Sequence, residues 1–320
     1  MRTVRCEPLG QSVSALGFGC ASLGSRVSPA DGNRAVAMAL DHGITWFDTA
    51  PPYGDGQAEA LLGACLKGRR TQAVICTKVG IARPRTDPAK AWVRSMLRPL
   101  VKAAPGLRSL VAKGRGPAQR TPLTGASVTA SLEASLRDLQ TDCVDVLALH
   151  DPSMEDVVDH NVLSALDAAV TSGKARAISV AGAPDVALQG LLGSEVFRVV
   201  QFPFDAFTPV VETVKGAAPE AFCAIHSVLG SGGLQRAIRA VREVPRIAAA
   251  LADTGYVGPS GPSDFLLDMA LAENEDGVVL MSMFRPENIQ RNVRRASGPV
   301  RAEAMRSLKA ILQDGANGPQ

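Results

Sequence analysis

The chain has 320 residues, of which 46% are hydrophobic and 20% are charged, and its formal net charge at pH 7 is +3. This much apolar material excludes a disordered chain, which would lack the apolar surface needed to offset the entropy lost on ordering. The small net charge gives no whole-protein field that points to nucleic acid. No apolar run reaches the about 18–20 residues that span a bilayer. The length fits one large domain or two ordinary ones.

Six cysteines are scattered along the chain, with no Cys-x-x-Cys pair and no cluster with histidine. A chain of this length needs no disulfide staples, and scattered cysteines suit a reducing compartment. We expect structural cysteines and no metal site, because zinc requires three or four converging ligands. The N-terminus carries Arg2, Arg5 and Glu7 and lacks an uninterrupted apolar segment. It therefore does not resemble a signal peptide, and we expect a cytoplasmic protein.

Short apolar runs rich in β-branched residues recur along the chain, each followed by a longer stretch with helical spacing. Runs that are apolar on both faces are typical of buried parallel strands. Eight such strands are predicted at residues 15–20, 44–48, 73–78, 144–150, 177–181, 199–202, 223–228 and 278–281. Helices are predicted at residues 31–41, 57–67, 127–139, 156–171, 185–192, 234–252 and 263–273, whereas 210–215 is too short to predict one. This alternation favours an α/β fold with a single closed (β/α)8 barrel, a TIM barrel, over residues 1–320.

Two stretches fall outside the alternation. Residues 82–126 form an insertion after the third strand that is too long for an ordinary loop. Ten basic residues against one acid, Asp87, give it a charge of +9 and leave −6 for the remainder of the chain. We favour a solvated basic flap whose apolar side packs on the barrel; the alternative is contact with a membrane surface or an acidic substrate. The second stretch, 286–313, predicts a C-terminal helix.

Four polar residues stand at or just beyond the ends of the early strands. The second strand ends at Asp48, the third at Lys78 and the fourth at His150, and Tyr53 follows Asp48 by five residues. In a (β/α)8 barrel, the C-terminal strand ends and the loops after them build the active site. We therefore expect these four side chains to converge on one mouth of the barrel.

An acid, a lysine and a tyrosine in contact can prepare a carbonyl group for reduction. A phenol with a pKa of about 10 is too weak an acid to protonate a carbonyl oxygen readily at neutral pH. A neighbouring ammonium lowers the pKa of the phenol, and a carboxylate keeps that ammonium charged inside the barrel. A histidine can hydrogen-bond the same carbonyl and fix its orientation. Together these groups polarise a C=O bond so that an external hydride can add to its carbon.

The sequence resembles the aldo-keto reductase superfamily over nearly the whole chain. Its opening VRCEPLGQSVSALGFGCASLG is similar to that family's N-terminal β-hairpin and first strand. ITWFDTAPPYG, CTKVG and DCVDVLALHDP resemble the segments that carry the family's catalytic Asp and Tyr, Lys and His. The resemblance implies a catalytic tetrad of Asp48, Tyr53, Lys78 and His150, with Tyr53 as the general acid and base. Trp92 and His150 are the candidate substrate contacts.

The resemblance also implies that NADPH, or less often NADH, binds extended across the barrel mouth. Gln201 matches the family's glutamine for the nicotinamide carboxamide, whereas Ala181-Gly182 replaces its Ser-Asn pair and His226 replaces its stacking aromatic residue. Asn288 stands near the family's basic residue for the 2′-phosphate, but Arg285 and Arg291 flank it and can substitute, so we expect NADP(H) rather than NAD(H). The candidate cofactor-binding residues are Gly19, Cys20, Ala21, Asp48, Ala181, Gly182, Gln201, His226, Ser227, Leu229, Ser231, Gly232, Ser282, Arg285, Asn288, Arg291 and Asn292.

The expected activity is hydride transfer between a nicotinamide cofactor and an aldehyde, ketone or sugar carbonyl or alcohol. One alternative is a catalytically weak or inactive barrel that binds nucleotide as a sensor or partner subunit. The replacements at Ala181, Gly182 and His226 favour that alternative, and the intact tetrad disfavours it. Another is hydrolytic or lyase chemistry that uses His150 and Asp48 without a nicotinamide. We expect a small-molecule substrate, no nucleic acid, no favoured membrane contact through the insertion, and a monomer or small homo-oligomer.

Overall fold

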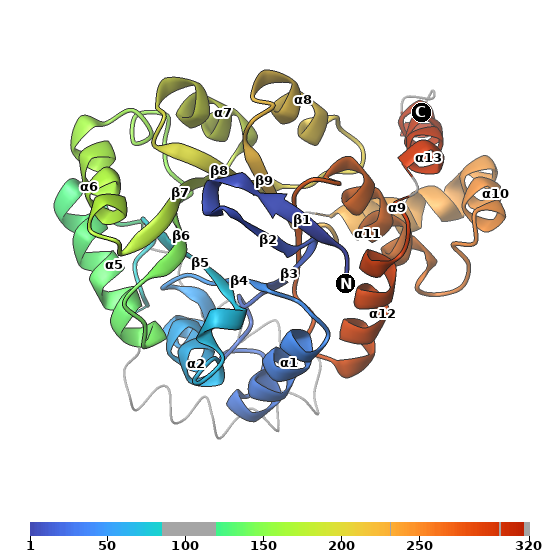
Figure 1. Ribbon diagram of the computed structural model, residues 1–320. Coiled ribbons are helices and arrows are strands. Elements are labelled where there is room, and N and C mark those ends of the chain that lie inside the picture. Colours follow the sequence, from blue (N-terminus) through green and yellow to red (C-terminus); the bar gives the residue numbers. More distant parts are fainter. Residues whose placement is uncertain (85–119, 231, 301, 317–320) are drawn as a thin grey trace.

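A closed barrel of parallel strands forms the centre of the molecule (Figure 1). The computed structural model describes residues 1–84, 120–230, 232–300 and 302–316. Within them the barrel order is β10-β3-β4-β5-β6-β7-β8-β9, closed between β9 and β10. The strands are β3 (Leu16–Gly19), β4 (Trp46–Asp48), β5 (Val74–Val79), β6 (Val144–His150), β7 (Ala175–Ala181), β8 (Phe197–Pro203), β9 (Phe222–His226) and β10 (Val278–Met281). The predicted TIM barrel and its eight strands are confirmed.

Helices surround the strands on the outside of the barrel, as Figure 1 shows. They are α1 (Pro29–Asp41), α2 (Ala58–Cys65), α5 (Gly125–Leu139), α6 (His160–Thr171), α7 (Pro184–Gly193), α8 (Val210–Ala217), α11 (Gly261–Glu273) and α12 (Pro286–Ser297). The helix α8 forms where the sequence pattern was too short to predict one, because Val211 and Val214 bury one face of it. The helix α6 begins four residues later than predicted, where Asp159 caps the amides of Asn161 and Val162.

Two predicted helices are wrong in that each is two helices in the structure. Residues 234–252 form α9 (Gly233–Glu243) and α10 (Pro245–Asp253), and Val244 between them is extended. Pro245 has no amide hydrogen and disfavours helical geometry in the residue before it, so the helix stops there. The C-terminal stretch likewise divides into α12 and α13 (Ala302–Ala316), after Gly298 and Pro299.

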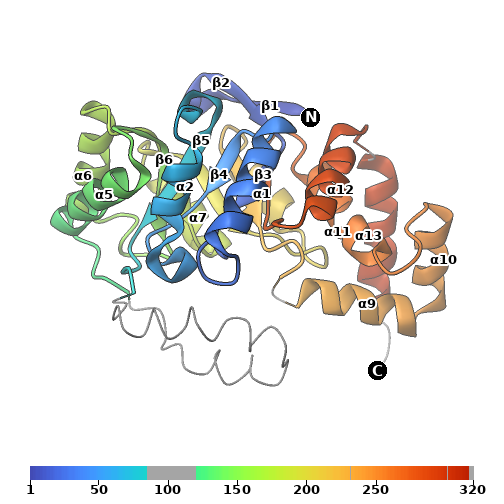
Figure 2. The same ribbon diagram turned by 90° about the horizontal axis from the view of Figure 1, so that it is seen from below.

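The helices α9, α10 and α13 extend to one side of the barrel (Figure 2). Met305 and Leu308 on α13 are buried, and Lys309 forms an ion pair with Glu273 of α11 at 2.8 Å. These contacts attach the C-terminal helix to the barrel's outer layer. Among the described helices, none combines the length and the hydrophobicity that a membrane span requires.

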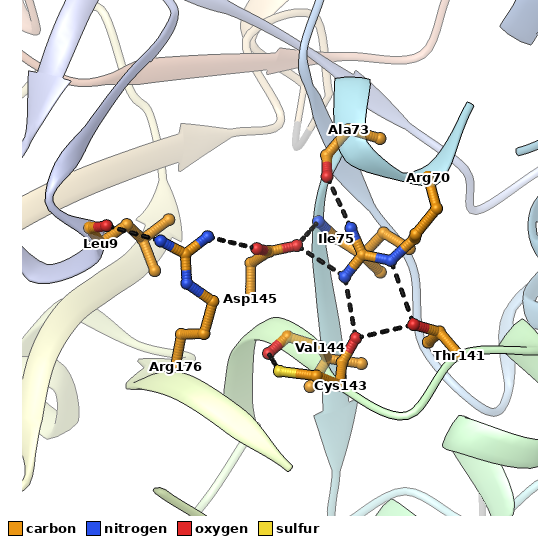
Figure 3. A network of polar contacts seen from close by, with 9 residues as sticks. All are labelled: Leu9, Arg70, Ala73, Ile75, Thr141, Cys143, Val144, Asp145 and Arg176. Atoms are coloured by element: carbon orange, nitrogen blue, oxygen red, sulfur yellow. Dashed lines mark hydrogen bonds and ion pairs between the residues drawn. The ribbon is translucent and has the colours of Figure 1, made fainter. Parts of the chain in front are cut away.

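The N-terminal hairpin lies across the barrel face at which the strands begin (Figure 1). Its strands β1 (Thr3–Cys6) and β2 (Gln11–Ser14) pair antiparallel, so the predicted hairpin is confirmed. A buried carboxylate, Asp145 near the start of β6, ties this face together (Figure 3). It accepts hydrogen bonds from Arg70 and the Ile75 amide at 2.9 Å and from Arg176 at 2.8 Å. Arg176 also donates to the Leu9 carbonyl at 2.7 Å, which links the barrel to the hairpin.

Replacing Asp145 with alanine should lower the free energy of unfolding by about 2–3 kcal/mol, because it leaves the Ile75 amide and two guanidinium groups without their acceptor. Urea unfolding measures the loss. The matched control is Asp41→Ala, which removes an exposed ion pair with Arg69 and should leave the unfolding midpoint nearly unchanged. If the two variants unfold at the same urea concentration, the network does not hold the hairpin face together.

Candidate active site

The predicted acid and lysine form a buried ion pair at the C-terminal mouth of the barrel. The Nζ atom of Lys78 on β5 lies 2.7 Å from both carboxylate oxygens of Asp48, the last residue of β4. It also donates to the Thr49 carbonyl at 3.1 Å. The two side chains are only 2% and 6% exposed. Burial alone would lower the pKa of Lys78, but Asp48 raises it well above its usual value, so this lysine is charged at physiological pH.

Tyr53 and His150 lie beside this pair. The Nζ atom of Lys78 is 4.8 Å from the centroid of the Tyr53 ring. The Tyr53 and His150 rings meet edge to face, with centroids 5.7 Å apart and an interplanar angle of 88°. The structure thus brings all four predicted catalytic residues together from the ends of three neighbouring strands.

The loop that carries Tyr53 is held by Gly54. Gly54 has a φ of 62°, and a Cβ atom there would lie 1.7 Å from the carbonyl oxygen of Leu23. Its amide donates to the Ala21 carbonyl at 3.2 Å, and the Tyr53 amide donates to Ala50 at 3.0 Å. Only glycine fits this left-handed, crowded position, so the close approach of the two loops orients the tyrosine.

The pKa of Tyr53 differs from the expectation. Burial raises it above its ordinary value of 10.0, and the charge of Lys78 lowers it by less than burial raises it. Lys78 acts in the predicted direction, but the net shift of the pKa is upward, because the loss of water around the phenol outweighs the nearby ammonium. Tyr53 is consequently protonated at neutral pH and can donate a proton.

His150 is neutral. Burial lowers its pKa to about 3, and the charges of Lys78, His226 and Arg120 act in the same direction. Its Nδ1 atom is buried and has no hydrogen-bond partner among the described residues. An unpaired buried acceptor is tolerated better than an unpaired donor, which favours the tautomer with the proton on Nε2. His150 can therefore donate one hydrogen bond but cannot act as a cationic acid near neutral pH.

Predicted cofactor residues lie along the rest of the same mouth, at the ends of β3 and of β7 to β10, which we call the second arc. Gly19 ends β3, Ala181 ends β7, Gln201 lies on β8, His226 ends β9, and Ser282 follows β10. Ser282 Oγ donates to the Gly19 carbonyl at 3.0 Å, which joins the ends of β10 and β3. These positions face the barrel mouth at which the tetrad lies, because all eight strands are parallel.

The polar groups on this arc are fewer than the family pattern implies. Ala181 and Gly182 offer no side-chain hydrogen bond, and the Gly182 amide donates to the Gln201 carbonyl at 3.0 Å. Gln201 is buried, and its Oε1 atom lies 3.9 Å from the Cys76 thiol. The Nδ1 atom of His226 is 2.8 Å from Ser227 Oγ, so the imidazole is fixed by its neighbour.

The remaining candidate cofactor residues differ in their exposure to solvent. Cys20 is fully buried, whereas Ala21 and Gly232 are exposed and Leu229 is half-buried. The Cys20 amide donates to the Asp48 carbonyl at 2.8 Å. Trp92 and Ser231, and with them most of the predicted basic insertion 82–126, lie outside the described residues.

In the segment after β10, the two predicted arginines differ. Arg285 is exposed at the start of α12 and has no ion-pair partner among the described residues, whereas Arg291 lies 3.3 Å from Asp264 on α11. Asn288 is half-buried. Asn292 is buried, and its amide donates to the Met283 sulfur at 3.6 Å. Of the two arginines, Arg285 is therefore the better placed for an external phosphate.

Two features of the site were not predicted. The Thr49 carbonyl completes the hydrogen bonding of Lys78, and a backbone carbonyl leaves no signal in a residue pattern. Arg120, the last basic residue of the insertion, lies close enough to His150 for its charge to act on the imidazole. Its position after a long insertion gave no register from which this proximity could be predicted.

The neutral, buried state of His150 predicts a loss of stability in acid. In the unfolded chain a histidine takes up a proton as the pH falls below about 6.5, whereas the folded state holds His150 neutral down to a pKa of about 3. The free energy of unfolding should therefore decrease below about pH 6.5, with His150 accounting for about 2 kcal/mol at about pH 5. Urea unfolding at about pH 7.5 and about pH 5 should show a smaller difference for His150→Gln than for the parent.

The exposed His160→Gln is the control for that titration, and it should retain the parent's difference between the two pH values. An unchanged difference in His150→Gln would contradict the neutral, buried imidazole.

Known proteins resemble this chain in sequence. A model described as the aldo/keto reductase family matches residues 15–202. Among curated proteins, 6-dehydroglucose reductase of Agrobacterium fabrum is 34% identical over 157 residues, which is 48% of this chain and 44% of that protein. L-galactose dehydrogenase of Arabidopsis thaliana is 30% identical over 184 residues, which is 55% of this chain and 46% of that protein. The matches thus span less than half the length of these relatives.

Solved structures share the fold over nearly the whole chain. A holo-form aldo-keto reductase from Bacillus halodurans superimposes with a TM-score of 0.73 at 20% identity, covering 98% of this chain and 96% of that one. An aldo-keto reductase from Klebsiella pneumoniae, solved in complex with NADP and acetate, gives a TM-score of 0.68 at 20% identity, covering 97% and 95%. At this identity the likeness concerns the fold. Because the family model matches more than half of the residues of this chain, the chain belongs to the aldo/keto reductase family.

Proposed function

We propose that the protein is an oxidoreductase that transfers hydride between a nicotinamide cofactor and a small carbonyl or alcohol, with Tyr53 as general acid and base. The observation that carries the proposal is the Lys78–Asp48 pair with 2.7 Å contacts, placed 4.8 Å from the Tyr53 ring. Membership of the aldo/keto reductase family supports it. Two curated relatives are named as a sugar reductase and a sugar dehydrogenase, which favours sugars or similar polyols as substrates.

The second arc of the mouth supports a nicotinamide cofactor. Gln201 offers an amide that suits a carboxamide, His226 offers a ring face for stacking, and Ser282 and Ser227 offer hydroxyl groups. When bound, the nicotinamide supplies or accepts the hydride. The loss of side-chain donors at Ala181 and Gly182 favours a second candidate, a nucleotide-binding sensor with weak activity.

The tetrad residues act on the substrate oxygen. As negative charge develops on the carbonyl oxygen, Tyr53 donates its phenolic proton and His150 donates a hydrogen bond that orients the same oxygen. Lys78 stabilises the phenolate that Tyr53 becomes, and Asp48 fixes the position and charge of Lys78. In the reverse direction, the phenolate of Tyr53 accepts the proton of the alcohol.

Cofactor choice depends on Arg285 in this proposal. Its exposed guanidinium at the start of α12 can bind a 2′-phosphate bidentately. Asn288, one turn later, is neutral and adds only a hydrogen bond. We therefore propose NADP(H) as the preferred cofactor.

Tyr53→Phe removes the proton donor and leaves the ring. Reduction of 4-nitrobenzaldehyde by NADPH should fall by about 10²–10⁴-fold in kcat/KM, while NADPH still quenches the protein fluorescence on binding. The matched control is Tyr256→Phe, which changes the chain's other tyrosine, hydrogen-bonded to Asp268 outside the barrel mouth, and should retain the parent rate. A sensor would show NADPH binding without turnover in the parent itself, and parent-like turnover in Tyr53→Phe would exclude it as the acid.

Arg285→Ala should weaken NADPH binding by about 1–3 kcal/mol, through loss of a charge-assisted contact to phosphate. NADH lacks that phosphate, so its dissociation constant should change little. Fluorescence titration with both cofactors measures the effect. Arg291→Ala is the comparison variant: because the guanidinium of Arg291 already pairs with Asp264, NADPH binding should weaken less than in Arg285→Ala. An equal loss for both cofactors in Arg285→Ala would reject the phosphate contact.

A further inference from the structure

Arg120 is a charged residue beside the tetrad that the proposed mechanism does not use. Its backbone forms an antiparallel bridge with Ile81, and the amide of the next residue, Thr121, donates to the Gly80 carbonyl at 2.9 Å. Gly80 directly follows β5, the strand that carries Lys78. The backbone of Arg120 is therefore fixed alongside the end of a catalytic strand.

Gly80, next to this bridge, lies close to the backbone of His150. It has a φ of 121°, and a Cβ atom there would lie 3.1 Å from the carbonyl oxygen of His150 and 3.6 Å from its amide nitrogen. The segment bridged to Arg120 thus runs close to the backbone of His150. The Arg120 side chain starts from this point, and its charge acts on the imidazole of His150.

The charge of Arg120 is not neutralised by the described part of the chain. Arg120 is exposed, and no hydrogen bond or ion pair joins its side chain to another described residue. Arg83, at the other root of the insertion, differs, because it pairs with the buried Glu59 at 2.7 Å and with Asp138. Lys78 is likewise balanced by Asp48. Among the described residues, Arg120 is thus a cation without an acidic partner at this side of the mouth.

The nearest acidic neighbour of His150 in sequence lies on the other side of β6. The amide of Asp151 donates to the Ala181 carbonyl at 2.7 Å, which attaches this residue to β7, whereas Gly80 and Arg120 lie on the β5 side. The Oδ1 atom of Asp151 lies 3.7 Å from the place a Cβ atom would take on Gly182, directly after β7, so the carboxylate is on the β7 side and an anion at Arg120 would meet the guanidinium.

We propose that Arg120 is a specificity-determining residue that binds a carboxylate on the substrate, so that the enzyme favours carbonyl compounds that carry an acid group. This inference rests on the proposed function. A guanidinium binds a carboxylate through two parallel hydrogen bonds, which fix orientation as well as charge. The carboxylate at Arg120 then holds the substrate while its carbonyl oxygen meets Tyr53 and His150.

The test compares two substrates that differ in charge and share the same reacting group, 4-carboxybenzaldehyde and its methyl ester. With NADPH and the full-length enzyme, the parent should show the higher kcat/KM for the acid. Arg120→Gln should lower the acid-to-ester ratio by about tenfold, chiefly through KM for the acid, and Arg120→Lys should restore part of it. The matched control is Arg198→Gln, an exposed arginine at the start of β8 on the opposite barrel face, which should retain the parent ratio.

An acid-to-ester ratio that is the same in Arg120→Gln and in the parent would overturn the inference. So would an equal fall for both substrates with a displaced pH profile, because Arg120 would then act through His150. If the parent reduces both substrates without preferring the acid, the carboxylate site is refuted and the proposed function stands. A parent that reduces neither substrate while binding NADPH refutes the proposed function, and the inference with it.

Discussion

The buried ion pair between Lys78 and Asp48 is the interaction on which the candidate site depends. Removing two charges from water costs several kcal/mol per ion, and such pairs are often no more stabilising than apolar residues of the same shape. Here the cost is offset by 2.7 Å contacts to both carboxylate oxygens and a 3.1 Å contact to the Thr49 carbonyl. The pair is therefore better explained by chemistry than by stability: it holds a positive charge beside Tyr53, where a phenolate would form during proton transfer.

The two faces of the barrel use polar groups differently. At the face where the strands begin, Asp145 satisfies several donors and joins the hairpin to the barrel. At the face where the strands end, His150 has an orphan nitrogen, while Arg120 and Arg285 are exposed cations without partners in the described part of the chain. Satisfied groups stabilise, and unsatisfied ones are available to ligands, which is the usual division of a (β/α)8 barrel.

The barrel and the meeting of the tetrad could be predicted, because buried parallel strands are continuous apolar runs and their ends share one face. Two helix breaks, at Val244 and at Gly298, were missed because the apolar residues keep their helical spacing on both sides of each break. In both places the next residue is a proline. The direction of the Tyr53 pKa was missed because a sequence shows that a lysine is near but not how completely the phenol is buried. The position of Arg120 was missed because contacts across a long insertion leave no periodicity.

The most direct test of the Lys78 charge is the pH dependence of alcohol oxidation in a single turnover with NADP⁺. The double variant Lys78→Met/Asp48→Asn removes both charges and leaves neither buried alone, so it should fold. Without the ammonium, nothing offsets the rise that burial causes in the pKa of Tyr53. The apparent pKa in the pH–rate profile should therefore increase, and the rate of alcohol oxidation near neutral pH should fall by about 10²-fold or more. A double variant with the parent's pH profile and rate would contradict the central role of the ion pair.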